Sequence, residues 1–213
     1  VMIGGNVTSH GEIVPRRFLE VLKDVRPEPF QNGSGRLELA EAIVSPNNPL
    51  TARVFVNRVW QHYFGEGLVD TPSNFGATGS RPSHPELLDD LAFRFMENGW
   101  SLKWLHREIL LSATYQQTSR VSSSKAEELD PGNRLLWRMN RRRLDAESIH
   151  DMLLEAGGNL DLTMGGPSSD IDHPVFNRRA VYAKISRDKP SQFLQVFDFP
   201  DPTIHAEQRS LTT

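Results

Sequence analysis

No cysteine occurs anywhere in the 213-residue sequence. Disulfide bonds, thiolate nucleophiles, cysteine zinc sites and covalently attached haem are therefore excluded within this chain. The cellular compartment stays open, because secreted domains of this size can fold without disulfides. Long apolar runs are missing too, and the short ones fall far below the roughly 20 residues of a membrane-spanning helix. We therefore predict no membrane span.

An excess of charge of either sign is also missing. Lys and Arg total 24 against 27 Asp and Glu, which gives a formal net charge of -3. The global basic field that favours nucleic-acid binding is absent, and we predict no nucleic-acid partner. The hydrophobic content of 38% and the charged content of 24% are ordinary for a soluble globular protein. Because the chain begins Val1-Met2-Ile3, we expect it to be a piece of a longer protein.

The short motifs that mark common catalytic and metal sites are missing as well. The seven histidines form neither His-Glu-x-x-His nor His-x-His, and the sequence contains no phosphate-binding glycine loop and no Gly-x-Ser-x-Gly. His62, His84 and His106 fall in or beside three consecutive predicted helices, so a shared metal site is conceivable, although structural roles at a helix end, in a cap and beside a core face explain them better. Asp170-Ile-Asp172-His173 lacks the glycine and the late glutamate of a calcium loop. We predict no metal and no cofactor in this chain, and we assign no catalytic residue.

A helix over residues 49–64 is the best-marked element of the sequence. Asn48 is suited to cap its first free N–H groups, Pro49 to occupy the first helical position, and Gly65 to end it. Apolar residues recur at helical spacing along one face, which predicts that this face is buried in a core. These residues are Ala52, Phe55, Val56, Val59, Trp60 and Tyr63.

The opposite flank of this helix is unusually polar, with two arginines, an asparagine, a glutamine and a histidine. Two interpretations stay open, because the flank can be a binding site or can hold neighbouring helices together. A buried arginine needs a carboxylate or carbonyl partner, so we expect Arg58 and the run Arg141–Arg143 to tie helices together. The full candidate cluster, either binding or structural, is Arg53, Asn57, Arg58, His62, His84, Arg141, Arg142 and Arg143.

Other capped segments predict that the chain is mainly α-helical. We expect a compact bundle of about five to six helices with long loops and a small peripheral β element. Residues 180–185 alternate in the manner of a strand, and we expect this strand to pair with the N-terminal region. The further predicted helices are 35–44 after Ser34, 83–98 with the capping box Ser83-His84-Pro85-Glu86, 101–113 capped by Ser101, 134–139, 145–156 capped by Asp145, and 191–197.

The composition predicts two parts of unequal size. Residues 1–33 are loop-rich and broken by prolines, so we expect an extended N-terminal arm that ends a preceding region. Residues 34–213 are expected to form one mainly helical domain. Within this domain, residues 116–130 are polar, which favours a flexible insertion or an internal boundary.

The densest charge feature is a group of five arginines. Guanidinium groups can hold a phosphate, sulfate or carboxylate through paired hydrogen bonds, so one interpretation is anion binding. In the other interpretation, these arginines pair with acidic neighbours and with carbonyl groups at helix C-termini. The arginines are Arg134, Arg138, Arg141, Arg142 and Arg143, and the acidic neighbours are Asp145, Glu147, Asp151 and Glu155.

Several long sequence words occur in an order typical of one family. The chain resembles the planctomycete-specific C-terminal domain of unknown function that is found in large envelope proteins, and the resemblance runs from about residue 34 to the end. The words that carry it include Asn48-Pro-Leu-Thr-Ala-Arg53, Val56-Asn-Arg-Val-Trp-Gln-His62, Ser83-His-Pro-Glu-Leu-Leu88, Gly99-Trp-Ser-Leu-Lys103, Asn133-Arg-Leu-Leu-Trp137, Arg141-Arg-Arg-Leu-Asp-Ala-Glu147 and Phe197-Asp-Phe-Pro-Asp-Pro202.

The resemblance implies a context and no reaction. It implies upstream domains in the same polypeptide, among them a cytochrome-c-like domain that would carry the haem. It also implies a periplasmic, cell-envelope or secreted location. The family supplies no catalytic residues that could be assigned to positions in this sequence.

Three functional hypotheses follow. The leading one is an accessory or interaction module of a multidomain bacterial envelope protein, which docks a partner domain or an anionic or polysaccharide ligand. The alternative is a hydrolase that acts on envelope or environmental polysaccharide, in a pocket where the polar flank meets carboxylates from residues 65–82. A third makes the module a docking surface for the haem domain, with Trp60 or His84 near the contact.

Overall fold

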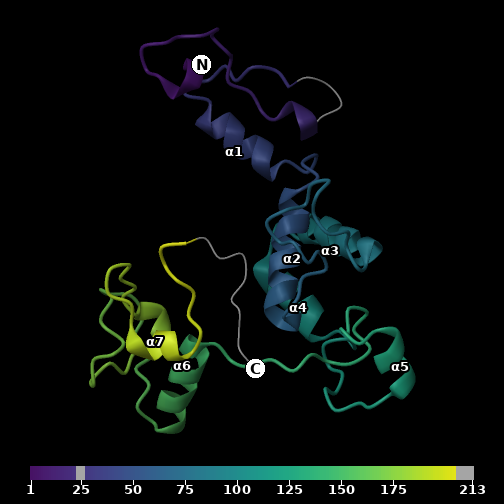
Figure 1. The fold of residues 1–213 in the computed structure, drawn as a ribbon, viewed down its shortest axis with the longest axis vertical. Coiled ribbons are helices and arrows are strands. Elements are labelled where there is room, and N and C mark those ends of the chain that lie inside the picture. The colour runs from purple at the N-terminus through teal and green to yellow at the C-terminus, as the bar shows by residue number, and fades with distance from the viewer. Residues whose placement is uncertain (23–26, 205–213) are drawn as a thin grey trace. The chain divides into compact units, whose positions relative to one another are not determined.

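The computed structural model of the chain describes residues 1–22 and 27–204. The chain divides into two compact units, Val1–Gln116 and Gln117–Thr213. Helices supply nearly all of the regular structure, so the predicted mainly α fold class is confirmed (Figure 1). The division falls at the edge of the polar segment 116–130, whereas the predicted boundary between residues 33 and 34 stays a prediction.

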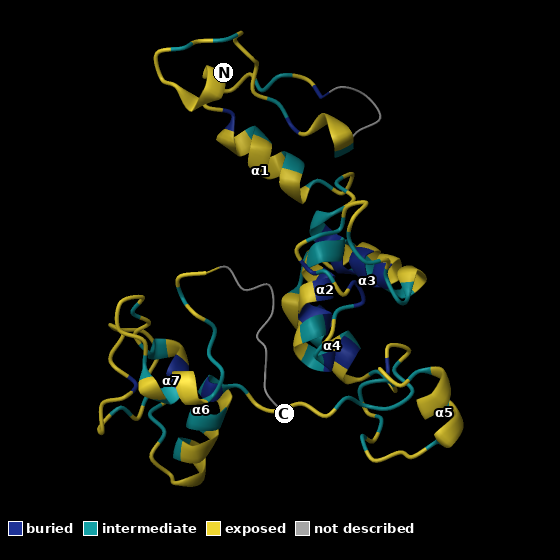
Figure 2. Cartoon of the chain, in the orientation of Figure 1, coloured by how far each residue is buried: buried dark blue, intermediate teal, exposed yellow. Residues whose placement is uncertain are grey.

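Within its described residues, the first unit contains four α-helices. α1 spans Arg36–Val44, α2 Thr51–Phe64, α3 Pro85–Glu97 and α4 Leu102–Leu110. Two short 3₁₀ helices, Ile3–Gly5 (η1) and Glu20–Leu22 (η2), precede them. No residue of α1 is buried, whereas α2, α3 and α4 surround a core (Figure 2).

The core of the first unit confirms most of the predicted apolar face of α2. Val56 and Phe64 of this helix are buried, and Leu105 and Ile109 of α4 are buried with them. Each large side chain removed from water stabilises the unit by roughly 1.5–3 kcal/mol. The other buried apolar residues of this core are Ala52, Val59, Trp60, Leu68, Val69, Leu88, Leu91, Ala92 and Phe95.

The predicted N-caps of the first two helices are wrong in detail. α1 begins after Gly35, not Ser34, and α2 begins two residues later than predicted, after Leu50; neither cap residue uses a side chain. Asn48 instead accepts the backbone N–H of Leu50 through Oδ1 (3.0 Å). Its Nδ2 and the Thr51 hydroxyl both donate to the carbonyl of Ile43, at 3.0 and 2.7 Å. Asn48 therefore joins the end of α1 to the start of α2.

The helix caps further along the chain give a mixed result. The prediction of a capping box is wrong. His84 occupies the N-cap position of α3, and its side chain makes no capping hydrogen bond to the helix. The Ser83 hydroxyl instead donates to the carbonyl of Leu68 at 3.4 Å. Ser101 caps α4 as predicted by accepting the N–H of Trp104. Gly65 ends α2 as predicted, with a φ of 89° that side-chain-bearing residues rarely adopt.

The loop between α2 and α3 is ordered by its own side chains. The Thr71 hydroxyl donates to the carbonyl of Asn74 (2.7 Å) and accepts the N–H of Ser80 (2.9 Å). Asn74 in turn donates to the hydroxyl of Thr78 at 3.1 Å. These hydrogen bonds join residues 71–80 to one another, in the loop whose Leu68 and Val69 lie against α2.

The second unit has a smaller core built by α6 and α7. Its helices are α5 (Ser124–Leu129), α6 (Ala146–Ala156) and α7 (Gln192–Val196), with the single 3₁₀ turn η3 at Ala180–Tyr182. Asp145 caps α6 as predicted, and Ser191 caps α7. The buried residues are Ala146, Ile171, Ala180 and Leu194, and Phe176, Phe193, Phe197 and Phe199 pack against them.

Three predictions for the second unit are wrong. Residues 134–139 form turns and not a helix, and α5 forms inside the segment predicted as a flexible insertion; its flexibility stays a prediction. Residues 180–185 form η3 and not a strand, because the N–H of Ala180 donates to the Asp151 carboxylate on α6 (2.7 Å). Beyond η3, Ala183 forms a single parallel bridge with Ser169, and the N-terminal region plays no part in it.

The apolar side chains of α6 are only partly buried. Met152 and Leu153 are 51% and 59% exposed, whereas Ile149 is half-buried. No helix within the described residues has the length and apolar character that crossing a bilayer requires.

Candidate functional site

The predicted candidate residues do not all lie in one unit. Arg53, Asn57, Arg58 and His62 lie on α2, and His84 lies at the start of α3, all in the first unit. The arginines 141–143 of the candidate cluster lie in the second unit, just before α6. Within the first unit, the side chains on α2 differ sharply in burial and in their partners.

Asn57 is fully buried, and its amide makes two hydrogen bonds with one residue of the following loop. Its Nδ2 donates to the carbonyl of Val69 at 3.0 Å, and its Oδ1 accepts the N–H of Val69 at 2.8 Å. The amide thereby supplies both the donor and the acceptor that a neighbouring β-strand would supply to the backbone of Val69. We call this arrangement the Asn57 clamp. It holds the loop against α2 and satisfies two buried backbone groups that would otherwise be unpaired.

Gly67 permits the Asn57 clamp to form. A Cβ at this position would lie 2.5 Å from the Val69 carbonyl oxygen and 2.7 Å from Nδ2 of Asn57. Both distances are shorter than any side chain tolerates, so only glycine lets the loop approach α2 this closely.

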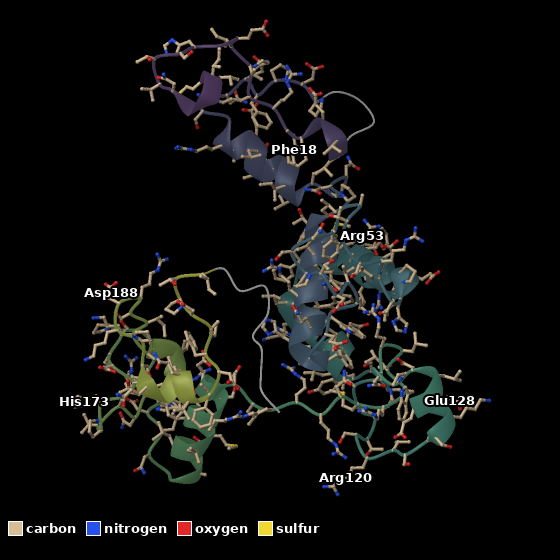
Figure 3. All side chains as sticks on the ribbon, in the orientation of Figure 1. Phe18, Arg53, Arg120, Glu128, His173 and Asp188 are labelled. Atoms are coloured by element: carbon tan, nitrogen blue, oxygen red, sulfur yellow. The ribbon has the colours of Figure 1, made fainter. Side chains whose placement is uncertain are left out.

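Arg53 joins α2 to α3. Its Nε donates to Oδ1 of Asp89 at 2.6 Å, and its NH1 donates to the carbonyl of Pro49 at 2.6 Å (Figure 3). The hydrogen bond from Arg53 lowers the pKa of Asp89, an effect that burial opposes and the positive charge of Arg53 strengthens. Arg53 and Asn57 thus link α2 to α3 and to the following loop, the kind of role that the structural interpretation of the polar flank expects.

Arg58 contradicts that interpretation. Its side chain is exposed and makes no hydrogen bond or ion pair with any described residue, so the prediction that it ties helices together is wrong. His62 is also exposed, one turn further along α2. Nδ1 of His84 lies 3.0 Å from the Ser83 hydroxyl, which places it in the link between the loop and α3. The flank therefore contains two structural residues, Arg53 and Asn57, and two surface residues.

A tyrosine–histidine pair joins α2 to α4, and the sequence pattern does not predict it. The hydroxyl of Tyr63 lies 2.8 Å from Nδ1 of His106, and the ring of Tyr115 meets the Tyr63 ring edge-on at 5.5 Å. Burial, with Tyr115 as a second cause, raises the pKa of the Tyr63 phenol. Helical spacing places Tyr63 in the apolar stripe, and no local pattern marks a partner 43 residues away.

The second unit contains a loop that carries the arginines. Asp130 accepts the N–H groups of Arg134 and Leu135 at 2.9 and 2.8 Å. Asn133 is 2% exposed; its Nδ2 donates to the carbonyl of Arg138 (2.7 Å) and its Oδ1 accepts the N–H of Arg138 (3.2 Å). We call this arrangement the Asn133 clamp. It repeats the Asn57 clamp in the second unit, and the two asparagines are the buried polar residues among those described.

The arginine segment, defined as residues 134–143, presents its guanidinium groups in different ways. Arg138 lies over the ring of Trp137 at 5.1 Å, and Nε1 of Trp137 donates to the carbonyl of Asp130 at 3.0 Å. Arg141 is exposed and has no partner among the described residues. Arg142 beside it is exposed as well. The segment therefore combines a guanidinium group stacked on a ring with others that face solvent.

Arg143 makes a structural contact, as expected of the run Arg141–Arg143, but its acidic partner is not one of those predicted from the sequence. It lies 3.4 Å from the Asp198 carboxylate and over the ring of Phe197 at 5.4 Å. Two of the acidic neighbours proposed as arginine partners also make other contacts. Asp145 caps α6, and Asp151 contacts His150 (3.1 Å) and Arg179 (3.8 Å).

Within residues 1–22 and 27–204, no group of three His, Cys, Asp or Glu side chains is placed to hold a metal ion. The hydrolase hypothesis requires the polar flank of α2 to converge with carboxylates on one cavity. Asn57 and Arg53 instead make separate bonds, to the backbone of Val69 and to Asp89. No described contact brings them together.

Comparison with known proteins identifies the family of the chain. No curated protein and no solved structure matches it significantly. The family model PSD1, described as a protein of unknown function (DUF1553), matches residues 35–213. This range contains α1 to α7, both clamps and the arginine segment. Because the match covers well over half of the sequence, the chain belongs to the PSD1 family.

Proposed function

We propose that the chain is a non-catalytic binding module that holds an anionic polysaccharide on the arginine segment of the second unit. The observation that carries the proposal is the combination of charge and rigidity in this segment. Five arginines and no acidic residue lie between residues 131 and 144. The backbone that carries them is fixed by Asp130 and by the Asn133 clamp.

The chemistry of the segment suits acid groups on a polymer. Guanidinium groups form paired, charge-assisted hydrogen bonds with carboxylates and sulfates and release bound water more readily than ammonium groups. Trp137 lies under Arg138, so the charge sits on a flat support. Arg141 lacks a counter-ion among the described residues and is available to a ligand.

Preorganisation adds to the affinity expected of such a segment. A flexible loop loses conformational freedom on binding, and this loss opposes association. Here the Trp137 ring donates to Asp130, Gln117 donates to the carbonyl of Leu136 (3.1 Å), and the N–H of Met139 donates to the carbonyl of Thr118 (3.3 Å). Most of the ordering is therefore complete before a ligand arrives.

The proposal is tested by retention of the full chain on heparin-agarose, with the salt concentration at elution as the readout. Exposed charges are screened by salt, so the wild-type chain should bind at low ionic strength and elute as salt rises. Arg141→Glu and Arg138→Glu should elute at clearly lower salt. Arg187→Glu changes an exposed arginine of the same unit and should elute with the wild type.

A further variant separates charge from rigidity. Asn133→Gly keeps access to the φ of 53° at this position and removes the clamp without changing charge. It should weaken retention while leaving the net charge unchanged. Equal elution of Arg141→Glu, Arg187→Glu and the wild type would show that the segment does not bind the polymer.

The cellular setting rests on the resemblance alone. We propose that the module works in the periplasm or envelope, or after secretion, beside upstream domains of the same polypeptide. In this setting haem would belong to one of those domains. Detection of the parent protein in isolated envelope fractions, with a haem stain on the same band, tests this setting.

A further inference from the structure

The exposed face of α2 combines an aromatic ring with a cation. Phe55, Arg58 and His62 are the exposed residues of this helix, and we call them the α2 stripe. Residues three or four apart on a helix are neighbours, and a seven-residue separation corresponds to about 10 Å along the axis. The three side chains therefore form one continuous line over two helical turns.

The ring of Phe55 rests on a buried ring of α3. It stacks on Phe95 of α3, with ring centroids 5.4 Å apart and planes inclined by 5°. Phe95 is 1% exposed and is held in turn by the edge of Trp100, at 5.4 Å. Phe55 itself is 39% exposed, which leaves its outer surface open to a ligand. The ring thus forms a fixed apolar platform.

Arg58 supplies the complementary charge beside this platform. It follows Phe55 by three residues, is exposed, and has no counter-ion among the described residues. A single exposed phenylalanine is common on protein surfaces and would indicate nothing by itself. A supported ring with an unpaired guanidinium one turn away is more specific, because it matches a ligand that has an apolar face and an acid group at its edge.

We propose that the α2 stripe binds a linear acidic oligosaccharide. The apolar face of one sugar ring lies on Phe55, and its carboxylate or sulfate accepts hydrogen bonds from Arg58. The next sugar ring extends toward His62, because the stripe is long enough for two linked rings and exceeds a single small anion. This site lies in the first unit and does not depend on the arginine segment of the second unit.

The experiment uses the full chain carrying Arg138→Gln and Arg141→Gln, so that the arginine segment contributes little. Calorimetric titration measures binding of oligogalacturonate, with a neutral maltose oligomer and polyglutamate as comparison ligands. Oligogalacturonate should bind, the neutral oligomer should bind more weakly, and polyglutamate, which lacks a sugar ring, should also bind more weakly.

Variants of the stripe identify the site. Arg58→Glu should weaken oligogalacturonate binding by about tenfold or more, because it replaces a charge-assisted bond with repulsion. Phe55→Leu should weaken it by about threefold to tenfold, whereas Phe55→Tyr, which keeps the ring, should bind like the parent chain. Arg36→Glu changes an exposed arginine on α1 that also lacks a partner among the described residues, and it serves as the matched control.

Three results would overturn the inference. They are no binding of oligogalacturonate, equal binding by Arg58→Glu and Arg36→Glu, and polyglutamate binding as tight as that of the sugar. A failure of the heparin experiment would leave this test intact, because the titration starts from a chain in which Arg138 and Arg141 are already replaced and its readout depends on Phe55 and Arg58 of the first unit.

Discussion

Replacing the buried amide of Asn57 by a carboxyl group should make the stability of the first unit depend on pH. Asn57→Asp conserves shape and keeps the acceptor for the N–H of Val69. It removes the donor to the Val69 carbonyl and turns a second oxygen toward that carbonyl. An unpaired buried acceptor costs about 1–3 kcal/mol, and the buried negative charge adds to this.

Protonation of the introduced carboxyl limits how much free energy of unfolding Asn57→Asp can lose. A protonated carboxyl can donate to the Val69 carbonyl and restore the clamp, so the folded protein takes up a proton when the ionised form costs too much. Protonating a carboxyl of unfolded pKa about 3.9 at pH 7 costs about 4 kcal/mol, at 1.36 kcal/mol for each pH unit. The loss at pH 7 should therefore be about 2–4 kcal/mol, and below about pH 4 it should shrink to less than about 1 kcal/mol.

The sign of the dependence follows from linkage. Burial raises the pKa of the introduced carboxyl above its unfolded value, so the folded state binds more protons between the two values. The free energy of unfolding of Asn57→Asp is therefore highest below the unfolded pKa of the carboxyl. It falls as pH rises through this interval and is constant above the folded pKa.

Urea unfolding of the full chain at several pH values measures the effect. Trp60, Trp100 and Trp104 report on the first unit, and Trp137→Phe removes the fluorescence of the second. Asn47→Asp, at an exposed position of the same unit, is the matched control and should show no such pH dependence. A pH-independent loss in Asn57→Asp, or none at pH 7, would refute the clamp as described.

Three further predictions concern the same unit. Gly67→Ala should lower the free energy of unfolding by more than about 2 kcal/mol, because its Cβ meets the Val69 carbonyl and Asn57, and thermal unfolding would measure this. Asp89→Asn should cost about 0.2–1 kcal/mol at neutral pH, because the pair with Arg53 is half-exposed. Since Arg53 lowers the pKa of Asp89, that loss should disappear as pH falls through the folded pKa, which paired melting curves at neutral and acidic pH would show. Arg58→Ala should change stability by less than about 0.5 kcal/mol, and a clear drop in Tm would show that Arg58 has a structural partner after all.

Local chemistry predicts the helices better than their caps. Helices with strong periodicity that are capped by a preceding serine or aspartate, such as α4 and α6, begin where the sequence indicates. Ser83 does not cap α3, because the helix begins one residue later, with His84 at the N-cap position, and the Ser83 hydroxyl donates to the carbonyl of Leu68, 15 residues earlier. The strand expected at 180–185 fails for a related reason, since Asp151 offers Ala180 a partner that no local pattern reveals.

The candidate site shows the same division. The sequence selects the polar residues of α2 but cannot separate their roles, because Arg53, Asn57 and Arg58 occupy similar positions in any helical pattern. The partners decide the roles: Asp89 pairs with Arg53, the Val69 backbone with Asn57, and none of the described residues with Arg58.

The sequence alone determined the absence of cysteine chemistry, the mainly α fold class and the positions of the main helices, because composition and helical periodicity are local properties. The tertiary structure decided which polar groups are structural and which face solvent. It placed one buried asparagine in each unit against the backbone of a residue 5 or 12 positions away. Burial of an amide depends on contacts across the fold, and such contacts follow from packing and not from the residue's immediate neighbours.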